Sequence, residues 1–247
     1  MNDKFYYANG HEIEPHIVQF YSSDSEVNYT KNQEHHQDEL DNNGWSLLSN
    51  GEYPYNPENP ALLDSVPLNY RFNKYGFRGV DFPEYKTPRS VITLGCNDTL
   101  GIGMPESLIW PTLISNTLKW RAINLALENT SFDTQYRLLL AWLPKIQSQY
   151  VFCLEPTDAC REEIVENEYR SEIYPAEMRE YYDINRDKNL RAMENLCDKV
   201  GAKFVYLPRN VWNFHENQDY ARDLAHSGRK SHIYITYQML KKAGVYD

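Results

Sequence analysis

Long apolar runs are missing from this sequence. No stretch approaches the roughly 20 residues that a membrane-spanning helix needs. The first residues, Met1–Tyr7, lack the charged head and apolar centre of a signal peptide. Both absences predict a soluble, cytoplasmic chain with no membrane partner.

Basic charge is also scarce. The 247 residues include 25 Lys and Arg against 35 Asp and Glu, which gives a net charge of −10 and a pI of about 5.2. The short pairs Arg229-Lys230 and Lys241-Lys242 do not offset this charge locally. A polyanion would be repelled by such a surface, so the composition excludes nucleic acid as a partner.

Features that hold metals, cofactors or disulfides are absent as well. The four cysteines, at positions 96, 153, 160 and 197, show no CxxC spacing, and we expect reduced thiols. The pair His35-His36 has no third and fourth ligand at suitable spacing, which favours a solvated loop. Gly101 and Gly103 lack the rest of a nucleotide-binding fingerprint. We therefore expect no metal and no cofactor.

One stretch organises the chain, from Ser90 to Gly103. Its β-branched apolar run, Val91–Leu94, predicts a short buried strand that Gly95 ends. A tight turn follows, and then an apolar-periodic segment, Leu108–Leu118, predicts a helix. A strand, a sharp turn and a helix together lift one side chain above the carboxyl edge of a parallel sheet, where α/β proteins build their sites.

The rest of the chain continues the alternation of strands and helices. We expect strands at 120–125, 150–154 and 203–207, and helices at 134–148, 186–200 and 231–243. Within 161–183 we expect one or two exposed helical pieces that could form a lid. Short apolar strands alternating with amphipathic helices predict a three-layer α/β/α sandwich with a mostly parallel sheet.

The N-terminal quarter has a different composition. Residues 1–66 are poor in apolar residues and contain several of the 20 tyrosines, as well as a proline-rich stretch around 51–60. Such a segment hardly buries a core of its own. We expect an irregular, tyrosine-rich extension at 1–66, which either packs on the α/β domain of 67–247 or docks onto a protein partner.

Three stretches resemble one known family. The strand and turn at 90–103, the lead-in Asn73–Gly79 and the block Asp223-Leu224-Ala225-His226 are similar to blocks of the SGNH (GDSL-type) hydrolases, in the variant whose first block reads Gly-Cys-Ser. The resemblance implies an SGNH fold and hydrolysis of esters, often on carbohydrates or lipids. Relatives with this first block are often encoded by bacteriophages, which extends the expectation to a virion-associated role.

Asn97 stands where that family has its nucleophilic serine. A carboxamide has no hydroxyl to deprotonate, so it cannot form the acyl-enzyme of serine chemistry. In a second, less favoured register of the motif, Thr99 takes the position of the nucleophile. Cys96 takes the position of the motif's aspartate, whose side chain should point away from the site.

Asp223 and His226 have the spacing of a catalytic pair in which a carboxylate orients a general-base histidine. A carboxylate three residues before a histidine accepts the imidazole Nδ1–H and fixes its tautomer. The oxyanion-hole residues of the family map to Asn129, through its backbone N–H, and to Thr157, through its hydroxyl. We expect that the N–H at 129 remains available.

Three functions stay open at this point. In the first, the chain keeps the fold and pocket but has lost turnover, and acts as a pseudoenzyme in binding or assembly, with a carbohydrate or ester ligand. In the second, it is an active ester hydrolase in which Thr99 attacks or His226 activates a water. In the third, it is an unrelated flavodoxin-like or Rossmann binding module.

Overall fold

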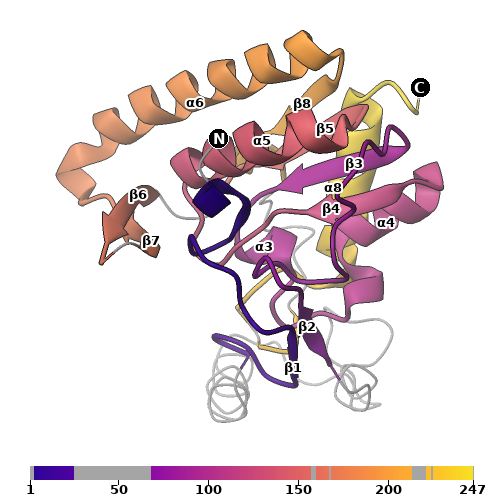
Figure 1. The fold of residues 1–247 in the computed structure, drawn as a ribbon, viewed down its shortest axis with the longest axis horizontal. Coiled ribbons are helices and arrows are strands. Elements are labelled where there is room, and N and C mark those ends of the chain that lie inside the picture. The colour runs from indigo at the N-terminus through magenta and orange to yellow at the C-terminus, as the bar shows by residue number, and fades with distance from the viewer. Residues whose placement is uncertain are drawn as a thin grey trace, which may run out of the picture.

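The computed structural model describes residues 3–24, 68–156, 160–166, 168–212, 221–223 and 225–246 (Figure 1). The expected site residue Thr157, the histidines at 35 and 36 and most of the extension lie outside these residues. Among the described residues, no helix is both long and apolar enough to cross a membrane. All four cysteines are buried free thiols.

A four-stranded parallel sheet forms the centre of the molecule. Its order is β4 (Arg121–Asn124), β3 (Ser90–Leu94), β5 (Tyr150–Leu154) and β8 (Lys203–Leu207). The register places Ile92 opposite both Ile123 and Val151. β3 is buried at every position because strands flank it on both sides and helices cover both faces.

Helices cover the two faces of this sheet (Figure 1). α5 (Phe132–Ile146) and α6 (Arg179–Val200) pack on the face that carries Ile92 and Val151. α4 (Trp110–Leu118) and α8 (Arg229–Lys242) pack on the face that carries Val91 and Phe152. Period-two alternation along the strands thus supplies two separate cores. The predicted three-layer α/β/α sandwich is confirmed.

Two short α-helices and two turns of 3-10 helix join these elements. They are α3 (Asn97–Leu100), η2 (Glu106–Leu108), η3 (Ala176–Met178) and α7 (Arg209–Trp212).

The segment predicted as exposed helical pieces is different in the structure. β6 (Cys160–Val165) and β7 (Glu168–Ile173) form an antiparallel hairpin that stands apart from the central sheet. α6 begins at Arg179, seven residues before the predicted start at 186. The prediction of one or two exposed helical pieces within 161–183 is therefore wrong for the hairpin and agrees with the structure only at η3 and at the first residues of α6.

The described part of the extension packs on the α/β domain. η1 (Asp3–Tyr6) leads into Ala8, which is buried in the core beneath α5. β1 (His16–Val18) pairs with β2 (Tyr70–Phe72) in a small antiparallel sheet. Residues 19–24 then continue toward the carboxyl edge of the central sheet, where the site lies.

Candidate functional site

The predicted turn after β3 is built around a glycine. A Cβ on Gly95 would lie 1.9 Å from Thr99 Oγ1, so the chain can fold into α3 at this point only without a side chain at position 95. The N–H groups of Thr99 and Leu100 bond the Cys96 carbonyl at 2.9 and 2.8 Å. Asn97 therefore begins a single helical turn at the end of the strand.

Asp223 and His226 form the predicted pair. His226 Nδ1 lies 2.5 Å from Asp223 Oδ2, and the backbone N–H groups of Ala225 and His226 donate to Asp223 Oδ1 at 3.2 and 3.1 Å. The Asp223 side chain is fully buried, whereas that of His226 keeps 15% of its surface exposed. The carboxylate thus holds the imidazole in one orientation with its Nε2 directed away from Asp223.

Backbone contacts join this pair to the turn after β3. Ser227 N–H donates to Asp98 Oδ1 at 3.0 Å, and Arg222 N–H donates to the Gly103 carbonyl at 3.1 Å. A Cβ on Gly103 would lie 2.7 Å from Ala221 Cβ, so the two segments approach as closely as a glycine permits. The structure brings the two sequence blocks together at one edge of the sheet.

Asn97 makes a contact that the sequence did not reveal. Its Oδ1 accepts the backbone N–H of Asn129 at 2.8 Å. Asn129 has φ 51°, a left-handed conformation that asparagine tolerates better than most residues. The expectation that the N–H at 129 is available is wrong, because the side-chain carbonyl of Asn97 occupies the donor that would serve an oxyanion.

Thr99 points into the interior. It is completely buried, and Trp110 Nε1–H donates to its hydroxyl at 3.3 Å. Its carbonyl accepts Asn124 Nδ2–H at 3.0 Å. The structure places Thr99 beneath the turn as a packing and hydrogen-bonding residue, and it does not bring the hydroxyl to the Asp223–His226 pair.

Residues 21–24, which we call the strap, are part of the site although no motif indicated them. Ser22 Oγ donates to Glu128 Oε1, and Ser23 Oγ donates to Asp223 Oδ2 at 2.7 Å. Two adjacent serines therefore bond the loop after β4 on one side and the Asp223–His226 segment on the other. Asp24 anchors the strap through an ion pair with Arg222 at 2.6 Å.

No protein-family model and no curated sequence matches this chain. Solved structures do match. A structure of TesA is 12% identical, with a TM-score of 0.44 over 62% of this chain and 97% of its own. The psychrotrophic esterase EstA from Pseudoalteromonas sp. is 13% identical, with a TM-score of 0.43 over 64% of this chain and 100% of its own. An acetyl xylan esterase variant from Geobacillus stearothermophilus is 9% identical, with a TM-score of 0.36 over 66% and 97%.

Two of these solved structures are of proteins described as esterases.

The electrostatics of the site favour a charged Asp223 and a protonated His226. Burial alone raises the pKa of Asp223, but hydrogen bonds from His226 and Ser23 outweigh burial and hold this pKa below its usual value. Burial alone lowers the pKa of His226, but the Asp223 carboxylate outweighs it, and Asp98 and Glu128 add to a net raised pKa.

His232 behaves in the opposite way. Burial is the largest cause that lowers its pKa to about 4, and its Nδ1 accepts the Trp110 N–H at 3.2 Å. It is therefore a neutral residue at the entry of α8.

Among the described residues, no cluster of three or more His, Cys, Asp or Glu side chains could hold a metal ion.

Proposed function

We propose that this chain is an SGNH-like protein whose site binds a ligand without forming an acyl-enzyme. The hydrogen bond from the Asn129 N–H to Asn97 Oδ1 carries the proposal. Acyl transfer needs a hydroxyl that His226 can deprotonate and donors that are open to the developing oxyanion. In this chain, Asn97 removes the hydroxyl and at the same time occupies a donor with its own carbonyl.

The proposed ligand carries a carbohydrate or ester group, in line with the resemblance of the sequence. A virion-associated binding or assembly role belongs to the same proposal and rests on the resemblance of the first block alone.

A second candidate is hydrolysis by a water that His226 activates. The 2.5 Å contact between His226 Nδ1 and Asp223 Oδ2 favours it, because this pair would orient the imidazole as a general base. The raised pKa of His226 opposes it, because a smaller fraction of the imidazole is then unprotonated and able to accept a proton at a given pH.

Position 97 provides the test. Wild type, Asn97→Ser, Asn97→Ala and Asn97→Ser/His226→Ala are assayed with short-chain aryl esters and with a fluorophosphonate probe. We expect no His226-dependent turnover in wild type. Asn97→Ser supplies a hydroxyl and releases the Asn129 N–H, so we expect labelling at position 97 that the double variant loses. Asn97→Ala, which releases the N–H without a nucleophile, is the matched control.

Two outcomes contradict the proposal. Ester hydrolysis by wild type that disappears in His226→Ala would establish the hydrolase instead. An Asn97→Ser variant that folds normally yet stays unlabelled would show that position 97 does not face His226 across a shared site.

A further inference from the structure

A groove lies between α4 and α8, two helices that stand side by side on one face of the sheet (Figure 1). Its volume is about 640 Å³. Its lining is drawn from both helices and from the segment after α8, and it includes Leu113, Asn116, Thr117, Ile233, Tyr237 and Tyr246. The Trp110 N–H at the start of α4 donates to His232 Nδ1 at 3.2 Å, near the start of α8. This bond fixes one helix against the other, so the α4–α8 groove is a fixed part of the fold.

Large apolar side chains of the α4–α8 groove are exposed. Ile233 is 49% exposed and Tyr237 is 43% exposed. Tyr237 stacks on Tyr246, with ring centres 6.1 Å apart and ring planes at 22°. Burial of apolar surface is favourable by about 25 cal/mol per Å², so a partner that covers these side chains gains binding energy. Exposed apolar side chains that gather in one patch mark an interaction surface.

Lysines flank this patch on the same side of α8. Lys230, Ile233, Tyr237 and Lys241 are all exposed, and they follow one another at intervals of three, four and four residues. Such intervals return to one side of a helix with 3.6 residues per turn. The two lysines are therefore roughly 16 Å apart along the helix axis, one at each end of the apolar pair. Lys241 Nζ lies 5.9 Å from the centre of the Tyr237 ring.

Neither helix of the α4–α8 groove contains an acidic residue. α4 has no charged side chain, and α8 carries the pairs Arg229-Lys230 and Lys241-Lys242. These pairs are short in the sequence, but the fold places both of them on one helix. In a chain with a net charge of −10, α8 thus brings four positive charges and no negative charge to the groove.

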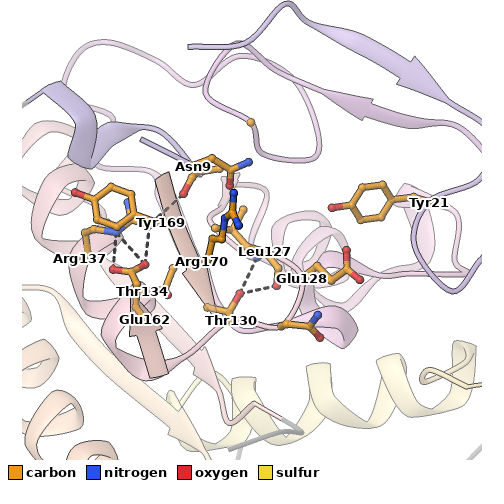
Figure 2. Close-up of a pocket in the computed structure, with 13 residues that line it drawn as sticks. Asn9, Tyr21, Leu127, Glu128, Thr130, Thr134, Arg137, Glu162, Tyr169 and Arg170 are labelled. Atoms are coloured by element: carbon orange, nitrogen blue, oxygen red, sulfur yellow. Dashed lines mark hydrogen bonds and ion pairs between the residues drawn. The ribbon is translucent and has the colours of Figure 1, made fainter. Parts of the chain in front are cut away.

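The cavity beside the strap differs in its charge (Figure 2). It has a volume of about 310 Å³, and its lining includes Arg137 and Arg170 together with Glu128 and Glu162. Two charges of each sign give this cavity no clear preference for the sign of a ligand. The charges of α8, in contrast, favour a negatively charged partner for the α4–α8 groove.

We propose that the α4–α8 groove is the docking site for an acidic segment of another protein. A large apolar side chain of that segment enters the groove against Ile233 and Tyr237, and its carboxylates lie beside Lys230 and Lys241. An apolar centre with charge pairs at the rim is the common arrangement of a protein interface. No lining residue of the groove takes part in the contacts of Asn97 or His226, so docking does not depend on the function proposed for that site.

Two other occupants fit the α4–α8 groove less well. A second copy that presented the same face would set lysines against lysines, which is unfavourable. An amphipathic helix that binds a membrane buries a protruding apolar face among the lipids, whereas these side chains line a hollow between two helices. An acidic protein segment matches both the charge and the shape of the groove.

A peptide library tests the proposal on the full chain. Random short peptides displayed on phage are selected on wild type after depletion on Ile233→Ser/Tyr237→Ser. We expect the enriched peptides to have a net negative charge and at least one aromatic residue, leucine or isoleucine. The enriched peptides are synthesised, and fluorescence anisotropy gives their affinity at low and at physiological ionic strength. We expect the affinity to fall as the salt concentration rises, because salt screens charge pairs at a surface.

Two variants locate the binding. Lys230→Glu/Lys241→Glu reverses both flanking charges and should weaken the enriched peptides about tenfold, mainly through slower association. Ile233→Ser/Tyr237→Ser removes the apolar contacts and should weaken them at least as much. The substituted side chains are all exposed, so both variants should fold, which their thermal midpoints check.

A matched control comes from α6. Tyr181 and Ile184 are also an exposed tyrosine and isoleucine one helical turn apart. Tyr181→Ser/Ile184→Ser should therefore leave the affinity for the enriched peptides unchanged.

Several results would overturn the proposal. They are the enrichment of no peptide, enriched peptides without net negative charge, and an affinity that Lys230→Glu/Lys241→Glu leaves unchanged. A wild-type dimer in analytical ultracentrifugation that Ile233→Ser/Tyr237→Ser dissociates would assign the groove to a second copy instead. Binding to vesicles that contain phosphatidylglycerol, lost in the same variant, would assign it to a membrane surface.

Discussion

Replacing Asp24 by alanine should strongly destabilise the protein. Asp24 is fully buried and accepts three hydrogen bonds, from Arg222 Nε at 2.9 Å, from Arg222 Nη2 at 2.6 Å and from the Tyr70 hydroxyl at 2.6 Å. The Arg222 side chain is only 8% exposed. Asp24→Ala therefore leaves a buried guanidinium without its carboxylate.

The magnitude follows from this geometry. Removing one partner of a buried ion pair costs about 3–5 kcal/mol. For a chain of this size each kcal/mol lowers the thermal midpoint by about 2–4 °C. We therefore expect Asp24→Ala to lower the midpoint by roughly 6–20 °C. Asp24→Asn keeps one carbonyl oxygen for the guanidinium and should lie between wild type and alanine.

Differential scanning calorimetry measures this shift. Asp187→Ala is the control, because Asp187 pairs with Arg186 at 3.0 Å in an exposed position, where such pairs contribute about 0–1 kcal/mol. A midpoint for Asp24→Ala no lower than that of Asp187→Ala would refute the anchoring of the strap by Arg222. Because Ser23 precedes Asp24, the same variant should also weaken the bond between Ser23 and Asp223.

Three more predictions concern the site. The pKa of His226 is raised in the folded chain, so His226 stabilises the fold below its unfolded pKa of about 6.5 and loses this contribution as the pH rises through the folded value. The difference in thermal midpoint between wild type and His226→Gln should shrink as the pH rises. NMR titration of Asp223→Asn should give a lower pKa for His226. Gly103→Ala combines φ 75° with a Cβ 2.7 Å from Ala221 Cβ, and urea denaturation should show a cost about 1–3 kcal/mol above that of Gly201→Ala, whose Cβ meets no atom within 4 Å.

The central sheet was predictable because its strands are continuous apolar runs. Val91–Leu94 and Tyr150–Leu154 are bounded by Gly95 and Pro156, and a parallel strand covered on both faces requires that pattern. The β6–β7 hairpin was missed because it buries little. Charged residues run through both strands, and only Cys160 of β6 is fully buried, so the segment lacks the apolar run that reveals a core strand.

The site was predictable only in part. Local spacing revealed Asp223 and His226, because their pairing spans three residues. The bond between Asn97 and Asn129 depends on a left-handed backbone at 129 and on the distance between two loops, and no local pattern encodes either. The strap was missed for a related reason. Ser23 has no motif around it, and its partner Asp223 lies 200 positions away.

That separation has a consequence for synthesis of the protein on the ribosome. Ser23 and Asp24 leave the exit tunnel early, whereas their partners Asp223 and Arg222 are translated 200 and 198 residues later. All four strands of the parallel sheet, the last of which ends at Leu207, therefore leave the tunnel before Arg222 and Asp223. The two ends can meet only afterwards, because contacts between distant residues form only when both are present. Closure of the N-terminal segment onto Asp223 is then a late step in biogenesis, and a chain that stops short of residue 222 should expose that segment to proteases.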